Sequence, residues 1–126
     1  MHPKSVSGLG FYVADITATA QFYAILGFRI GEQSDTYLKM YLNWFWLQFN
    51  AISSESKPEF KDEAQAEMKG AGLFINISVD NVDEAYTSLV AAGLHPSSEP
   101  RDWPWGNREF VIRDPDGYKL VIFQKK

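Results

Sequence analysis

The chain contains the same segment twice, at an offset of 66 residues. Residues 8–28, GLGFYVADITATAQFYAILGF, align without a gap with residues 74–94, FINISVDNVDEAYTSLVAAGL. Each copy starts with a six-residue strand-like run, 8–13 or 74–79, and continues into a stretch with apolar residues at helical spacing. An internal repeat of this kind restricts the fold to one built from two similar βα units.

The helix of each copy has a clear beginning and end. Asp15 and Asn81 stand at matching positions just before the helical stretch, and both residue types are good N-caps. Gly27 and Gly93 stand at its end, where a residue that tolerates the left-handed conformation commonly stops a helix. The repeat therefore predicts a strand followed by a capped helix in both halves of the chain.

More strands are predicted after each helix, over 28–33, 37–42 and 44–50 in the first copy and over about 94–98, 108–113 and 118–124 in the second. The last two are joined by the turn sequence DPDG. Residues 52–72 are polar and read as a linker that is partly helical from about 58 to 69. The sequence thus predicts one α+β domain over 1–126, with tandem βαβββ modules at about 5–51 and 73–126.

Composition excludes several classes of function. The net charge is −4, which does not favour nucleic acid or an anionic membrane as partner, and the apolar runs are too short to cross a bilayer. There is no cysteine, so disulfides, thiolate catalysis and cysteine-based metal sites are excluded. The first residues, MHPKS, lack an apolar signal region, and we expect a cytoplasmic protein.

Three segments carry a resemblance to a known family: FYVADITATAQFYAILGF, SVDNVDEAYTSLVAAGL and PWGNREFVIRDPDGY. In this order and spacing they resemble the vicinal oxygen chelate superfamily, which includes glyoxalase I, extradiol dioxygenases, fosfomycin-resistance enzymes and bleomycin-resistance proteins. The third segment is most similar to the bleomycin-resistance branch. The resemblance implies a cupped mixed β-sheet with helices on its outer face and up to four metal-ligand positions on the concave face.

The residues at those four positions are unsuited to a metal. By register they are Gly8, Gln48, Phe74 and Val121, and only Gln48 has a side-chain donor, which is weak and neutral. Divalent metals need at least three converging ligands. His95 follows the second helix and is expected to be a loop residue. We therefore expect no metal and no other cofactor.

Alternation along the strands separates an aliphatic face from an aromatic one. The first face, with residues such as Phe11, Leu47, Ile77 and Ile122, should pack under the helices. The second mixes rings and isolated polar groups, and Gly8 and Gly10 should open room over it. The residues predicted to bind a ligand there are Tyr12, Trp44, Trp46, Gln48, Phe74, Asn76, Trp103, Trp105 and Phe123.

Alternatives remain for this face. It could instead face water or a dimer partner, and Trp103 and Trp105 could cover the end of the core rather than stack on a ligand. No catalytic residue is predicted. Glu109 is the candidate for a general base, but pairing with a neighbouring arginine is more common for such a residue.

Three functions follow in order of preference. The first is a metal-free protein that sequesters a planar or aromatic small molecule, such as an antibiotic. The second is a lyase or dioxygenase-type enzyme with an atypical or absent metal site. The third is a structural dimer with a vestigial cleft. The resemblance also implies a homodimer, and the linker at 52–72 would allow its two chains to exchange modules.

Overall fold

The computed structural model describes all residues, 1–126, and the chain divides into two compact units, Met1–Glu67 (unit 1) and Met68–Lys126 (unit 2). No helix is both long enough and apolar enough to cross a membrane. The prediction of a single domain with modules at 5–51 and 73–126 stays a prediction.

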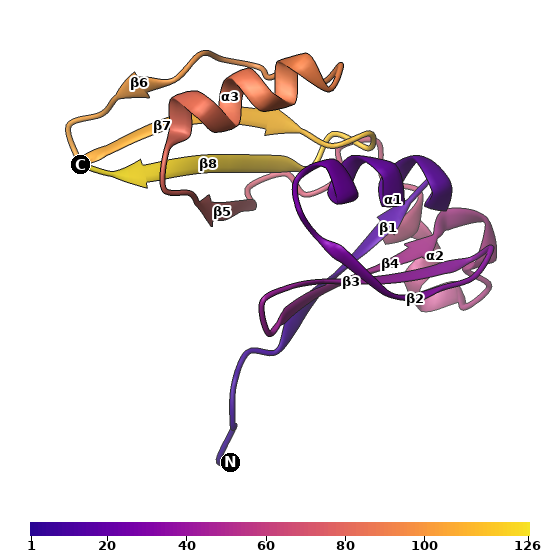
Figure 1. The fold of residues 1–126 in the computed structure, drawn as a ribbon. Coiled ribbons are helices and arrows are strands. Elements are labelled where there is room, and N and C mark those ends of the chain that lie inside the picture. The colour runs from indigo at the N-terminus through magenta and orange to yellow at the C-terminus, as the bar shows by residue number, and fades with distance from the viewer. The chain divides into compact units, whose positions relative to one another are not determined.

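Unit 1 forms a four-stranded mixed sheet with one helix packed on it (Figure 1). Its elements are β1 (Gly8–Val13), α1 (Ile16–Ile25), β2 (Arg29–Gln33), β3 (Tyr37–Leu42) and β4 (Phe45–Ala51), followed by a short 3-10 helix, η1 (Ile52–Ser54), and α2 (Pro58–Ala64). The strand order is β1-β4-β3-β2, with β1 parallel to β4 and the other pairs antiparallel.

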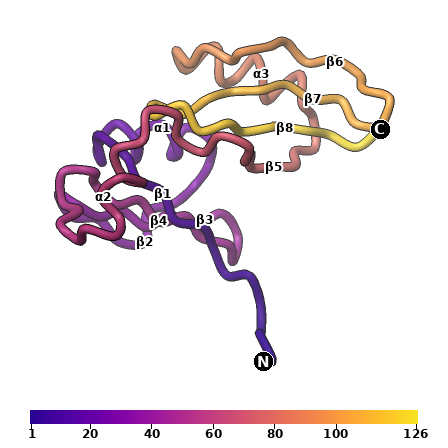
Figure 2. Tube along the Cα trace, turned by 180° about the vertical axis from the view of Figure 1, so that it is seen from behind, coloured from indigo at the N-terminus to yellow at the C-terminus, as the bar shows by residue number.

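Unit 2 repeats this architecture. Its elements are β5 (Phe74–Ser78), α3 (Val82–Ala91), β6 (Arg101–Asp102), β7 (Asn107–Arg113) and β8 (Lys119–Lys125). The strand order is β5-β8-β7-β6, with β5 parallel to β8, and the strands lie side by side in both views of the chain (Figures 1 and 2). The predicted α+β fold with two tandem βαβββ modules is confirmed.

Both predicted helix caps are present. The Asp15 side chain accepts a hydrogen bond from the Ala18 N–H at 3.0 Å, and Asn81 accepts one from the Glu84 N–H at 3.1 Å. Gly27 and Gly93 end the two helices with φ of 98° and 90°. A side chain at either glycine would be strained in this conformation, so these residues fix where the chain leaves the helix.

The aliphatic face of each sheet forms the core of its unit. In unit 1, Phe49 is fully buried, with its ring 5.3 Å from Phe11 and 4.9 Å from Tyr23 of α1. In unit 2, Phe110 is buried and meets Tyr86 of α3 edge-on at 5.4 Å. The residues expected under the helices are therefore the ones that pack there, and the opposite face of each sheet is left to contact something else.

The predicted strand at 94–98 is wrong. The second strand of this module is only the two residues of β6, at Arg101–Asp102. Pro96 lies inside the predicted strand and Pro100 follows it, and a proline has no N–H to donate to a strand partner. The segment still runs beside β7, since the Ser97 N–H donates to the Val111 carbonyl at 2.7 Å and the Ser98 hydroxyl accepts from the Val111 N–H at 3.0 Å.

Most other boundaries agree with the sequence prediction to within one residue, and two differences have a clear cause. The helix expected over 58–69 ends at Ala64, its single buried residue, so no apolar face continues beyond that point to hold a longer helix. The strand expected over 44–50 starts one residue later, because Asn43 and Trp44 form a turn in which Asn43 has a φ of 58°. Trp44 therefore belongs to a turn and not to a strand.

Candidate functional site

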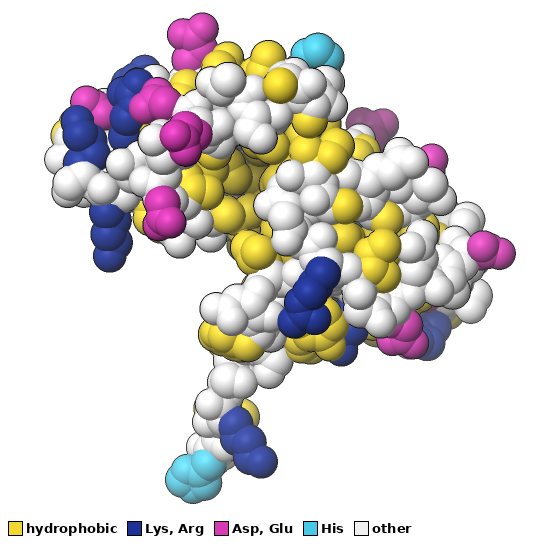
Figure 3. All heavy atoms as spheres, in the orientation of Figure 1, with side chains coloured by type: hydrophobic (Ala, Val, Ile, Leu, Met, Phe, Trp, Pro, Cys, Tyr) yellow, Lys and Arg dark blue, Asp and Glu magenta, His cyan; other side chains and the backbone are white.

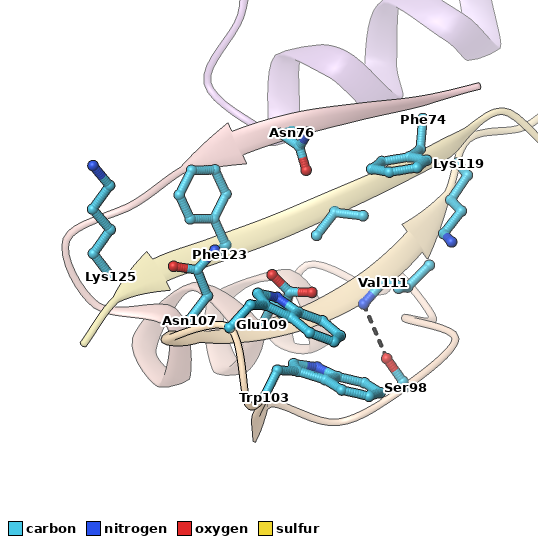
Figure 4. Close-up of a pocket in the computed structure, with 12 residues that line it drawn as sticks. Phe74, Asn76, Ser98, Trp103, Asn107, Glu109, Val111, Lys119, Phe123 and Lys125 are labelled. Carbon is cyan, nitrogen blue, oxygen red and sulfur yellow. Dashed lines mark hydrogen bonds between the residues drawn. The ribbon is translucent and has the colours of Figure 1, made fainter.

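The candidate site is a cavity of about 680 Å³ formed by unit 2 alone (Figure 4). Side chains alternate along β7, so Phe110 and Ile112 point to the core under α3. Asn107, Glu109 and Val111 point to the opposite side and line the cavity. The cavity is lined by Phe74, Asn76, Ser98, Trp103, Trp105, Asn107, Glu109, Val111, Lys119, Val121, Phe123 and Lys125.

The floor of the cavity is apolar and its polar groups are few. Val111 and Val121 are paired across β7 and β8, and Phe74 and Phe123 flank them. The hydrogen bond from the Val111 N–H to the Ser98 hydroxyl holds the segment 97–99, between Pro96 and Pro100, beside β7, where Ser98 forms part of one wall of the cavity (Figure 4). An apolar cavity with isolated polar groups is typical of small-molecule sites.

Trp103 and Trp105 form a stack at one edge of this cavity. Their ring centroids are 4.7 Å apart and their planes are inclined by 12°. The Arg101 guanidinium carbon lies 3.5 Å from the Trp103 centroid. One face of an indole has no room for both groups at these distances, so Trp103 is held between Arg101 and Trp105.

This arrangement leaves one indole face open, and it belongs to Trp105. The Trp105 residue is 62% exposed and lines the cavity. The order of the stack is Arg101, Trp103, Trp105, with both faces of the middle ring in use. Trp105 is thus the ring on which a flat molecule can stack, and Trp103 supports it from behind.

The loop that carries the two tryptophans is tied down at both ends. The Trp103 N–H donates to the Asn107 carbonyl at 2.9 Å, and the Gly106 N–H donates to the Trp103 carbonyl at 3.1 Å. Gly106 has a φ of 96°, which a residue with a side chain adopts only with strain. Glycine at this position therefore allows the tight turn that stacks the rings.

Ion pairs reinforce the same loop. Arg108 binds Asp83 at the start of α3 through two hydrogen bonds of 3.0 Å, and it binds Asp102 at 3.2 Å. Lys126 binds the other oxygen of Asp102 at 2.6 Å. Hydrogen bonds from Lys126 and then Arg108 hold the pKa of Asp102 below the ordinary value of an aspartate. Charged side chains of both signs gather at this end of unit 2, near the C-terminus (Figure 3).

The sequence-predicted site residues divide between the two units. Five of them, Phe74, Asn76, Trp103, Trp105 and Phe123, line the unit 2 cavity. The other four lie in unit 1. Tyr12 donates a hydrogen bond from its hydroxyl to Glu55 at 3.0 Å, and Trp44 is 64% exposed in its turn. That any of the nine binds a ligand stays a prediction.

Gly8 and Gly10 do not open space, contrary to the sequence prediction. The Trp46 ring packs flat against Gly8, and the Lys39 ammonium nitrogen lies 4.4 Å from the centroid of that ring. The Gln48 side chain occupies the room over Gly10. The space left by the missing side chains on β1 is therefore filled by long side chains from β4, and the Trp46 ring already has Gly8 and Lys39 as neighbours.

This packing predicts different outcomes for alanine at the two glycines. A methyl group at Gly8 would overlap with the Trp46 ring and the Trp46 carbonyl oxygen, so Gly8→Ala should lower the free energy of unfolding by about 1–3 kcal/mol. At Gly10 the nearest atom would be Gln48 Cγ at 3.5 Å, an ordinary contact. Gly10→Ala should therefore stay within about 1 kcal/mol of the parent protein. Denaturant unfolding measures both, and equal values for the two variants would contradict this packing.

Apart from Ser98, the lining residues absent from the predicted ligand-binding set come from β7 and β8. Asn107, Glu109 and Val111 alternate along β7, and each is paired in register with a cavity residue of β8. Extending the alternation from β8 to β7 would have found them. Ser98 carried no comparable signal, because it lies outside any strand and reaches β7 through its hydroxyl.

Metal ligands are the remaining question of site chemistry. The chain has no group of three or more His, Asp and Glu residues close enough together to hold an ion. Gly8, Phe74 and Val121 have no donor atoms in their side chains, and His95 is exposed after α3. The residues at the four expected positions do not fit a divalent cation.

Comparison with known families agrees with the fold. Residues 6–122 match the Glyoxalase/Bleomycin resistance protein/Dioxygenase superfamily. The chain belongs to this superfamily. It is 28% identical to proteins named bleomycin resistance protein from Geobacillus stearothermophilus and Staphylococcus aureus, over 121 residues that cover 90% of this chain and 91% of each relative.

Solved structures of the superfamily share the fold. A glyoxalase-related enzyme from Fulvimarina pelagi gives a TM-score of 0.78 at 18% identity, over 98% of this chain and 89% of that chain. Lactoylglutathione lyase from Agrobacterium tumefaciens gives 0.76 at 19% identity, over 98% and 95% of the two chains. At these identities the likeness concerns the fold, and it does not transfer an activity.

Proposed function

We propose that this protein is a metal-free binding protein that sequesters a planar or aromatic small molecule in the unit 2 cavity. The observation that carries the proposal is the open face of Trp105, supported from behind by Trp103 and Arg101. A ring already held in place loses little conformational freedom when a ligand stacks on it, and less ordering cost means tighter binding. The site is thus preorganised for a flat ligand.

The other lining residues support the same kind of ligand. A cavity of about 680 Å³ is within the usual range for drug-sized molecules. Val111, Val121 and Phe123 give it an apolar floor, and Asn76 and Asn107 offer amide groups that can fix a ligand's orientation. The named relatives include bleomycin resistance proteins, which is consistent with sequestration of an antibiotic in the cytoplasm.

A homodimer is the assembly that we propose for this binding protein. Both β1 and β5 are edge strands of their sheets, and Leu73 and Phe74 at the start of β5 are about half exposed. Sedimentation at micromolar concentration should give the mass of a dimer. A monomer under these conditions would count against the assembly, including its module-exchanged form.

The function is tested by a thermal-stability screen with metal analysis. Protein purified without chelator should contain no stoichiometric Zn, Ni, Mn or Fe. Flat fused-ring compounds should raise its melting temperature, because a ligand at about 100 times its Kd adds about 2.7 kcal/mol to stability. Non-planar compounds of similar size serve as controls. Stoichiometric metal, or equal stabilisation by both sets of compounds, would instead favour the lyase or dioxygenase-type alternative.

A further inference from the structure

We infer that Glu109 makes the cavity selective for planar ligands that carry a positive charge on or beside the ring. This inference rests on the proposed function and adds the charge of the ligand to it. The Glu109 carboxylate lines the cavity from β7, partly buried. None of the ion pairs or hydrogen bonds of the chain involves it.

The natural partner of Glu109 is occupied elsewhere. Arg101 stands directly opposite Glu109 across β6 and β7, where cross-strand charge pairs usually form. Its guanidinium instead lies over the Trp103 ring, 3.5 Å from the centroid. The neighbour of Glu109 on the other side is Phe123 of β8, which offers no hydrogen bond. The carboxylate thus has no ion-pair partner, and it lies beside an aromatic surface.

Neither of the two lysines that line the cavity forms an ion pair with Glu109. Lys119 is four strand positions from Phe123, the residue opposite Glu109, which corresponds to roughly 13 Å along the strand. Its ammonium nitrogen lies 5.0 Å from the centroid of Phe74. Lys125 is exposed at the rim of the cavity, and its side chain points away from Glu109 (Figure 4). At physiological salt, exposed charges more than about 8 Å apart are largely screened.

Trp105 and Glu109 therefore offer a cation two matching contacts. The open indole face attracts a positive charge through its quadrupole, and the carboxylate attracts it through its charge. A neutral ring of the same shape gains only the stacking. The contact with Glu109 is thus the part of the site that separates charged ligands from neutral ones.

Proflavine and acridine test this inference, because they share one fused-ring skeleton and differ in charge. At slightly alkaline pH proflavine is a cation and acridine is neutral. We expect the parent protein to bind proflavine roughly 5- to 10-fold more tightly than acridine. Glu109→Gln should remove most of this preference by weakening proflavine binding alone, and Glu109→Asp should keep part of it.

The control and the contrary results are defined by the same titrations. Glu84→Gln removes an equal charge from an exposed position on α3 and should leave the preference unchanged. If Glu109→Gln keeps the preference, or if acridine carboxylate binds more tightly than proflavine, the inference is wrong. If, in that case, both probes still bind and Trp105→Ala weakens the binding of both, the proposed function still holds. Failure of every probe to bind would overturn both.

Discussion

Trp105→Ala should weaken the binding of a planar probe such as proflavine roughly 5- to 150-fold while leaving the melting temperature almost unchanged. Stacking of a flat ring on an aromatic side chain contributes about 1–3 kcal/mol, by analogy with nucleobase stacking. Trp105 is 62% exposed and lies in a loop outside the core, so its removal costs the fold little. The affinity is measured from the fluorescence anisotropy of the probe, which does not depend on the remaining tryptophans.

Two matched variants separate stacking from support. Trp105→Phe keeps a smaller flat ring and should retain part of the affinity. Trp103→Ala removes the ring behind Trp105, and its effect should be smaller than that of Trp105→Ala, because the open face that meets the ligand remains. If Trp105→Ala instead unfolds the protein and leaves the affinity of the folded fraction unchanged, the Trp105 ring covers the hydrophobic core and does not bind the ligand.

Phe110→Ala should have the opposite effect, a large loss of stability without a change in intrinsic affinity. Phe110 is 1% exposed and meets Tyr86 of α3 edge-on. Removal of a buried phenylalanine ring typically costs about 3–5 kcal/mol, a large part of the 5–15 kcal/mol that stabilises an ordinary domain. Denaturant unfolding measures this loss, and proflavine titration of the folded protein measures the affinity.

The neighbouring residue provides the comparison for Phe110. Val111 points to the cavity side of the same strand and is only partly buried, so Val111→Ala should cost about 1 kcal/mol or less. A loss for Val111→Ala equal to that for Phe110→Ala would mean that the two faces of β7 are not divided between core and cavity. The division would also be contradicted if fully folded Phe110→Ala protein bound proflavine more weakly than the parent protein.

The repeat in the sequence was sufficient to predict the architecture. Asp15 and Asn81 cap the two helices through the hydrogen bonds expected of them, and Gly27 and Gly93 end the helices in the left-handed conformation. These signals are local, since each depends on a few neighbouring residues. For that reason they could be read before any contact between distant strands was known.

The surroundings of the β1 glycines could not be read in this way. A glycine in a strand is compatible with an open space or with the close approach of another group. The choice at Gly8 is made by Trp46, which is distant in sequence and reaches the glycine through the parallel pairing of β1 with β4. The sequence shows that Gly8 and Trp46 are present, but it does not show the rotamer that places the Trp46 ring against the Gly8 backbone.

The tryptophan loop was only partly predictable. The sequence placed Trp105 among the residues predicted to face a ligand, and Trp105 does line the cavity. The stack of Arg101, Trp103 and Trp105 was not foreseen, because it depends on side-chain orientations in a segment without regular structure. The anchoring of this loop through Asp102 likewise needs Arg108 and Lys126, which come from two other parts of the chain.

A crystal structure of metal-stripped protein soaked with proflavine is the most direct test of the proposed function. We predict density for a flat ring system in the unit 2 cavity, parallel to the open face of Trp105 and beside the Glu109 carboxylate. The stack of Trp103 and Arg101 behind it should be unchanged. Density for the ring system at another place, or a cavity that stays filled with solvent at saturating proflavine, would contradict the proposal.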